Sequence, residues 1–185
     1  MVFIDAKTLA ERFPQASFSS PKSQVLQENY KSDELKEAFK KIERLVRVRD
    51  RSVLEVRNRL DRDGFAVDVV DAAVDRALSV GYLDDTRFAD VLVRSRLRSG
   101  KGLSGILREL RNHAIDPFEQ LEGFPEDYLR ENSSQEEAAI ALLCRKPPRS
   151  KNEKQAAYAK LIRSGYSVDI AAEATKRWYE AKNSK

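Results

Sequence analysis

The chain has 185 residues, of which 35% are charged and 41% belong to the hydrophobic set. This length suits one large domain or a row of small modules, and it exceeds the size at which a core needs disulfides. Basic residues exceed acidic ones by 34 to 30, giving a net charge of +4, which is too small to indicate nucleic-acid binding by itself.

Single copies of two reactive side chains exclude several classes of site. Cys144 is the one cysteine and His113 the one histidine, so neither an intrachain disulfide nor a mechanism with two imidazoles is possible. The longest apolar run, residues 138–144, is far shorter than the roughly 20 residues that a membrane span requires. Asp5 interrupts the start of the chain before a signal-like apolar segment develops. We therefore expect a cytoplasmic protein with no membrane contact, no metal and no cofactor.

Apolar residues at helical spacing dominate the chain, and glycine and proline are scarce. The first helix is predicted to begin after Asp33, which is available as its N-cap. Ser52 opens a second helix in a capping-box pattern, and Gly64 is predicted to end it in a left-handed conformation. Asp84 and Asp85 are predicted to be turn and N-cap acids of a later helix. The sequence therefore predicts an all-α protein.

The helical pattern recurs with a period of about fifty residues. Leucines near the end of a helix, each followed four positions later by a small residue, repeat in step: Leu60 and Gly64, Leu110 and Ala114, Leu161 and Gly165. The period predicts tandem three-helix repeats of the helix-turn-helix kind that pack in line as an elongated, curved rod. We expect a flexible N-terminal tail and three such units, with these bounds: 1–31, 32–82, 83–131 and 132–185.

Charge alternates along the chain in step with the repeats. Basic residues predominate from Arg94 to Arg111, acidic residues from Asp116 to Glu137, and basic residues again from Ala138 to Arg163. A charge run usually solvates an exposed helix face, but this alternation favours at least one basic contact surface. The candidate residues for binding a partner or nucleic acid are Arg87, Arg94, Arg96, Arg98, Lys101, Arg108, Arg111, Arg145, Lys146, Arg149, Lys151 and Lys154.

Angular positions on a helix over residues 86–99 predict a basic ridge. The inward stripe is expected to comprise Phe88, Val91, Leu92 and Ser95. Three arginines are expected to share the exposed rim of that stripe: Arg87, Arg94 and Arg98. Val93 and Leu97 lie near the opposite side, where we expect a neighbouring unit to cover them.

Few features of the chain indicate catalysis. Residues 99–102 resemble part of a phosphate loop, but Gly102 stands where that loop requires Ser or Thr. His113 has no serine or cysteine near it in sequence, so a cap or surface role is expected. Cys144 and Trp178 are expected to pack in a core. We do not expect an enzyme.

Three ordered motifs follow one another along the chain. They are Arg51-Ser52-x-x-Glu55-x-x-x-Arg59-Leu60-x-x-x-Gly64-Phe65, then Gly81-Tyr82-Leu83-Asp84-Asp85-x-Arg87-Phe88-Ala89 with Lys101-Gly102-x-x-x-Ile106-x-x-Glu109-Leu110, and last Leu142-x-x-Arg145-Lys146 with Arg163-x-Gly165-Tyr166. Over roughly residues 35–180 the chain resembles the bacterial RecX family, the regulatory proteins of RecA recombinase. Ala114 stands where that family usually has glycine, so the turn there is expected to be strained or reshaped.

The resemblance implies both the fold and the activity. RecX proteins consist of three tandem three-helix motifs and bind RecA–DNA filaments. They usually suppress strand exchange, ATP hydrolysis and coprotease function, without catalysing a reaction themselves. The resemblance thus implies a role in recombination, DNA repair and the SOS response, with the RecA filament and the DNA inside it as partners. We expect a monomer with weak or no binding to DNA alone.

Two other functions stay open from the residues themselves. A stand-alone helical nucleic-acid-binding module would place a basic middle helix in the major groove, although the weak net charge argues against strong binding to DNA alone. A generic helical-repeat scaffold for another protein is the second. A curved rod favours the filament regulator, because its long concave face can follow a helical groove while basic blocks meet acidic protein surface or phosphates.

Overall fold

The computed structural model describes residues 21–131 and 134–184, which form ten helices with no strand among them. Helix α2 spans Pro21–Val48. Residues 1–20 of the expected tail lie outside the described residues, and the rest of that tail is the beginning of α2. The prediction of Asp33 as an N-cap is therefore wrong, because the helix begins twelve residues earlier, at Pro21.

The first group of helices consists of α2, α3 (Val53–Arg62) and α4 (Val67–Ser79). The Ser52 side chain accepts a hydrogen bond of 3.2 Å from the backbone N–H of Glu55, which confirms the predicted start of α3. The three helices enclose one apolar core: Ala38, Ile42, Val56, Leu60, Val69, Val70, Ala73, Val74, Ala77 and Leu83.

The second group contains α5 (Asp85–Arg98), α6 (Leu103–Arg111), α7 (Pro117–Gln120) and α8 (Glu126–Arg130). Its core is separate from the first and is built from α5, α6, α8 and the loops beside them: Phe88, Ala89, Leu92, Val93, Leu97, Ile106, Leu110, Ile115, Leu121, Phe124 and Tyr128. Asp84 is the N-cap of α5 and accepts a 2.9 Å hydrogen bond from the N–H of Arg87, as expected for an acid at this place.

The third group contains α9 (Gln135–Arg145), α10 (Glu153–Arg163) and α11 (Val168–Asn183). Trp178 is 5% exposed in its core, which confirms the predicted packing role. Cys144 is exposed, so the prediction that it lies in a core is wrong. The buried positions of α9 are Ala139 and Leu143, and one further residue turns the side chain at 144 away from that face.

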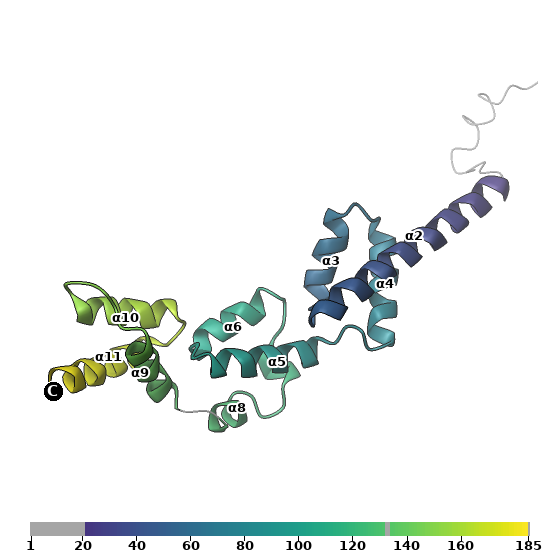
Figure 1. Cartoon of the computed structure of the whole chain (residues 1–185). Helices are drawn as coiled ribbons and strands as arrows, with labels where there is room; N and C mark the ends of the chain where they lie inside the picture. Colours follow the sequence, from purple (N-terminus) through teal and green to yellow (C-terminus); the bar gives the residue numbers. More distant parts are fainter. Residues whose placement is uncertain (1–20, 132–133, 185) are drawn as a thin grey trace, which may run out of the picture.

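The three groups follow one another along an elongated, bent line (Figure 1). Each apolar core closes within its own group of helices, and no core residue is shared between groups. This arrangement is the predicted one for tandem three-helix repeats. We propose that the units have the bounds expected from the period, except that the first boundary cuts through α2.

The orientation of α5 differs from the sequence prediction. Val93 and Leu97 pack into the core of their own unit, whereas Val91 is 49% exposed and Ser95 is also exposed. The predicted inward stripe is therefore right for Phe88 and Leu92 and wrong for the other two residues. α5 carries apolar residues around much of its circumference, so helical periodicity alone could not decide which face meets the core.

Left-handed residues end the middle helix of every unit. Gly64 and Gly165 both have φ of +88°, which confirms their predicted conformation. Ala114 occupies the equivalent place with φ of +57°, so the alanine keeps the turn at the cost of backbone strain. The turn is thus strained and not reshaped.

Candidate interaction surface

Hydrogen bonds join the first unit to the second at the beginning of α3. The backbone N–H of Val53 donates to Oδ1 of Asp85 over 2.8 Å. Beside it, the Oγ atom of Ser52 lies 2.8 Å from Nδ1 of His113, and Ser52 is fully buried. The prediction of a cap or surface role for His113 therefore missed its contact with another unit. Burial raises the pKa of the Asp85 carboxyl, and the Val53 hydrogen bond opposes that shift.

The second junction repeats the first one at an offset of fifty residues. The N–H of Leu103, fifty positions after Val53, donates over 2.9 Å to Oε1 of Gln135, fifty positions after Asp85. The N–H of Gly102 also donates to the carbonyl oxygen of Ser164 over 3.0 Å. In both junctions, the first turn of a middle helix therefore receives an oxygen from the start of the next unit. Such bonds satisfy donors that a helix cannot pair internally.

Glycines at the second junction allow the backbones of the second and third units to come into direct contact. The N–H of Gly105 donates to the carbonyl oxygen of Gly165 over 3.1 Å. A methyl carbon placed on Gly102 would lie 2.3 Å from the carbonyl carbon of Gly165, a separation that real side chains do not show. The Tyr166 hydroxyl adds a 2.8 Å hydrogen bond to the carbonyl oxygen of Gly100, and burial raises the pKa of Tyr166 to about 12.

A cleft opens beside each junction, on the face of α5 and α9 that turns toward the preceding unit. The first cleft has a volume of about 600 Å³ and the second about 210 Å³. The two are lined by equivalent residues at an offset of fifty: Phe88 and Ala138, Val91 and Ala141, Leu92 and Leu142, Ser95 and Arg145. The exposed side of α5 is thus the wall of a repeated surface feature.

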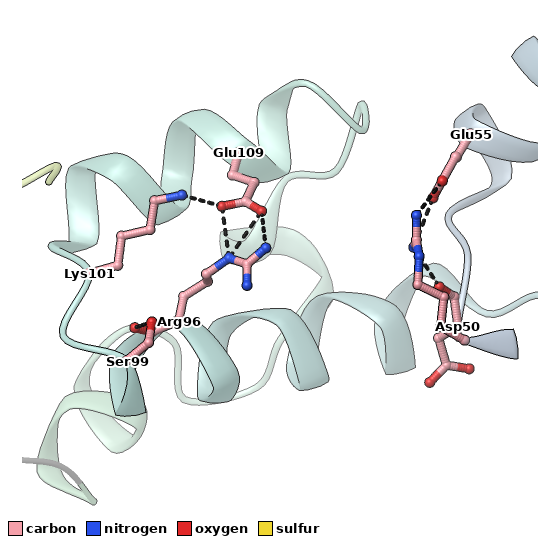
Figure 2. Close-up of polar contacts among 7 residues, drawn as sticks. Asp50, Glu55, Arg96, Ser99, Lys101 and Glu109 are labelled. Atoms are coloured by element: carbon pink, nitrogen blue, oxygen red, sulfur yellow. Dashed lines mark hydrogen bonds and ion pairs between the residues drawn. The ribbon is translucent and has the colours of Figure 1, made fainter. Parts of the chain in front are cut away.

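A charged network forms the rim of the first cleft. Figure 2 shows Glu109 between Arg96 and Lys101, with Asp50 and Glu55 apart from them at the other side of the view. The Arg96 guanidinium binds Glu109 through Nε at 3.0 and 3.1 Å and through a second nitrogen at 2.6 Å, and Lys101 forms an ion pair with the same carboxylate. The Arg96 guanidinium, helped by Lys101, lowers the pKa of Glu109 to about 2, against the opposing effect of burial.

Four of the candidate cations in the second unit are engaged within the chain. Arg96 and Lys101 share Glu109, and Arg94 pairs with Asp90 at 2.9 Å and with Glu131. Arg87 reaches Asp50 of the first unit at 3.4 Å. The predicted ridge of Arg87, Arg94 and Arg98 therefore presents one uncompensated charge, that of Arg98.

The remaining candidates have no carboxylate partner among the residues that the structure describes. Six of them are exposed without an interacting acid: Arg98, Arg108, Arg111, Lys146, Arg149 and Lys151. Arg145 donates to the Ser99 carbonyl oxygen over 3.3 Å, and Lys154 lies 6.0 Å from the centre of the Tyr179 ring.

Like charges meet in the third unit. Burial lowers the pKa of the Lys160 ammonium, and the positive charges of Lys146 and Arg145 lower it further. Lys160 was not among the sequence candidates, although it belongs to the same basic run. An uncompensated group of cations of this kind attracts anionic partners.

Comparison with known proteins shows which proteins this chain resembles. The family model described as "RecX, second three-helix domain" matches residues 84–118. The "Regulatory protein RecX" of Bacillus licheniformis is 34% identical over 151 residues, which are 77% of this chain and 55% of that protein. Over 77% of its length the chain is thus similar to a RecX regulatory protein.

Further relatives and solved structures show the same similarity to RecX proteins. The "Regulatory protein RecX" of Legionella pneumophila is 35% identical over 80 residues, 43% of this chain and 53% of that protein. The chain spans about half the length of the curated RecX relatives it matches. The crystal structure of RecX from Lactobacillus salivarius matches 80% of this chain and 97% of its own, with a TM-score of 0.59 and 19% identity. A second crystal structure of a regulatory protein RecX matches 89% of this chain and 83% of its own, with a TM-score of 0.63 and 16% identity.

The RecX relatives carry the name of regulatory proteins, and the two solved structures share the tandem three-helix fold. Among the described residues of this chain, no helix is both long and apolar enough to cross a membrane.

Proposed function

We propose that this protein binds RecA–DNA filaments and inhibits the recombinase, ATPase and coprotease activities of RecA. The main support for the proposal is the match of residues 84–118 to the family model "RecX, second three-helix domain". The relatives of the chain are also named regulatory proteins. In this role the protein is a regulator without catalytic activity of its own. It acts as a monomer in the cytoplasm, in recombination, DNA repair and the SOS response.

An elongated row of units with unpaired cations suits binding to a long, anionic assembly. The twelve candidate cations divide into two groups by their present partners. Arg87, Arg94, Arg96 and Lys101 already pair with acids: Arg87 with Asp50 of the first unit, and the other three with acids of their own unit. The direct contacts with the filament are assigned to the eight candidate cations without a carboxylate partner among the described residues: Arg98, Arg108, Arg111, Arg145, Lys146, Arg149, Lys151 and Lys154.

The test is co-sedimentation of the protein with RecA filaments at physiological salt, using RecA from the same source. We expect binding to filaments assembled on single-stranded DNA and little binding to the same DNA without RecA. Substoichiometric protein should also slow DNA strand exchange and single-strand-dependent ATP hydrolysis. No binding at equimolar protein, with both activities unchanged, would contradict the proposal.

A stand-alone nucleic-acid-binding module is less well supported by the geometry. In a helix-turn-helix, residues at the start of the recognition helix contact the bases. Here the first turns of α3 and α6 are covered by the next unit, through Asp85 and through Ser164 and Gly165. The control with bare DNA separates this function from the proposed one.

A further inference from the structure

The two internal junctions show which hydrogen-bond acceptor the first turn of a middle helix meets. In each, the N–H at the first helical residue, Val53 or Leu103, donates to a side-chain oxygen at the start of the next unit, Asp85 or Gln135. The third unit has the same turn at the start of α10. The N–H of Glu153, the first residue of α10, has no hydrogen-bond acceptor within the described part of the chain.

The charge around this turn is positive. The loop from α9 to α10 carries Lys146, Arg149 and Lys151, all exposed, and none of them pairs with an acid of the described residues. Glu153 is the one carboxylate at the turn, and Lys182 binds it at 2.5 Å. An incoming carboxylate would therefore meet uncompensated cations and a free helix N–H, both of which favour negative charge.

An apolar groove adjoins the same turn. It lies between α10 and α11, has a volume of about 570 Å³, and is lined by Asn152, Lys154, Gln155, Tyr158, Ala172, Thr175 and Lys176. Thr175 is 2% exposed, and its hydroxyl oxygen has no hydrogen-bond partner among the residues that the structure describes. A buried polar atom without a partner is costly, so a donor or acceptor from a bound group would relieve it.

We propose that the start of α10 and this groove form a docking surface for an acidic segment of a partner protein. A carboxylate of the partner takes the place at Glu153 N–H that Asp85 takes at Val53, and neighbouring side chains of the partner fill the groove. Protein is the proposed occupant because both internal junctions seat a side-chain oxygen of protein at this position. A nucleic acid, whose bases could stack on Tyr158, is an alternative that the test below addresses. The inference rests on the proposed function only in taking the RecA filament as the partner.

The test uses the full chain and fluorescein-labelled poly-L-glutamate, with binding followed by fluorescence anisotropy. Reversal of two charges, Lys146→Glu with Lys151→Glu, is expected to weaken binding about tenfold. The matched control reverses two exposed cations of α2 without acid partners among the described residues, Lys40→Glu with Arg44→Glu. It should stay within about twofold of the wild type, and circular dichroism checks that both variants remain helical.

Three results would overturn the docking surface. The Lys146→Glu, Lys151→Glu variant could bind poly-L-glutamate as well as the control variant does. It could lose affinity for oligo-dT as strongly as for poly-L-glutamate, which would assign the surface to phosphates. Light scattering could show a dimer that the reversal dissolves, which would assign it to a second copy of the chain. If instead the wild type binds poly-L-glutamate as expected but does not sediment with RecA filaments, the proposed function fails and the docking surface stands.

Discussion

The Oδ1 atom of Asp85 accepts a 2.8 Å hydrogen bond from the backbone N–H of Val53, so an acid of the second unit caps a helix of the first. The second junction uses the amide oxygen of Gln135 in the same position. An uncharged acceptor therefore suffices for this contact. Since burial raises the pKa of Asp85, the charge of this carboxylate costs stability where it is ionised.

Asp85→Asn should keep the cap and be at least as stable as the wild type at pH 7. Asp85→Ala should lose about 1 kcal/mol, because the Val53 N–H is left without an acceptor. The folded pKa of Asp85 lies above its unfolded value of 3.8, so its contribution to stability falls as the pH rises through the folded pKa, and Asn removes this dependence. Urea unfolding at pH 4 and pH 7 measures both effects. If Asn is as destabilising as Ala, the charge itself holds the junction.

Gly102→Ala should destabilise the protein by about 1–3 kcal/mol through overpacking. The φ of Gly102 is −70°, which any residue can adopt, so the cost comes from the contact with Gly165 and not from the backbone conformation. Gly64→Ala is the control, because a methyl group there meets nothing within 4 Å and tests only the left-handed conformation. Urea unfolding measures the cost, and small-angle scattering measures whether the second and third units move apart. An unchanged midpoint for Gly102→Ala would mean that this junction can open at no cost.

Ala114→Gly should stabilise the protein by about 0.5 kcal/mol. An L-residue in the left-handed conformation costs about 1–2 kcal/mol, and the greater freedom of glycine in the unfolded chain offsets part of the gain. Ala72→Gly on the exposed side of α4 is the matched control, and it should lose about 1 kcal/mol. The two midpoints of thermal unfolding should therefore shift in opposite directions, and a shift in the same direction would contradict the strained turn.

Glu109→Gln should remove a pH-dependent part of the stability. The folded pKa of Glu109 is about 2, below the ordinary 4.5, so its stabilisation is fully present above pH 4.5 and is lost as the pH falls toward 2. Its side chain is 21% exposed, and a partly solvated network of this kind contributes about 1 kcal/mol. Glu119→Gln, an exposed acid without a partner among the described residues, is the control. Wild type and Glu109→Gln should converge near pH 2, whereas a constant difference would place the effect elsewhere.

Arg94→Glu and Arg98→Glu should differ in stability although both reverse one charge on the same helix. Arg94 pairs with Asp90 and Glu131 and lies 4.7 Å from the centre of the Tyr128 ring, so its reversal should cost about 1–2 kcal/mol. Arg98 has no such partner among the described residues, and its reversal should stay within about 0.5 kcal/mol. Thermal melting separates the two, and equal melting temperatures would show that the Arg94 pairs contribute nothing.

Local features of the fold could be predicted from the sequence because their causes are local. Ser52 and Ser134 cap their helices through a residue three positions away, and Gly64 and Gly165 have the left-handed conformation that ends a helix. The period of fifty predicted the repeats for the same reason, since every unit carries its own apolar pattern.

The contacts of the candidate cations could not be predicted in this way. Arg94 and Glu131 are 37 residues apart, and so are Arg87 and Asp50, so nothing in the neighbouring sequence marks either pair. Charge counted along the chain left the basic block of residues 94–111 with one acid, but folding brings acids from other elements to it. The offset of fifty between Asp85 and Gln135 could have revealed the junctions, because equivalent positions of a repeat tend to make equivalent contacts.

The joining of units by a few hydrogen bonds has a mechanical consequence. Tension between the two ends of the chain would act on the bonds of Val53, Leu103 and Gly102, while each apolar core stays closed around itself. The protein would behave as three stiff segments with two compliant joints. Such a chain can adjust its length and bend to a template whose pitch changes, and no segment has to unfold for it to do so.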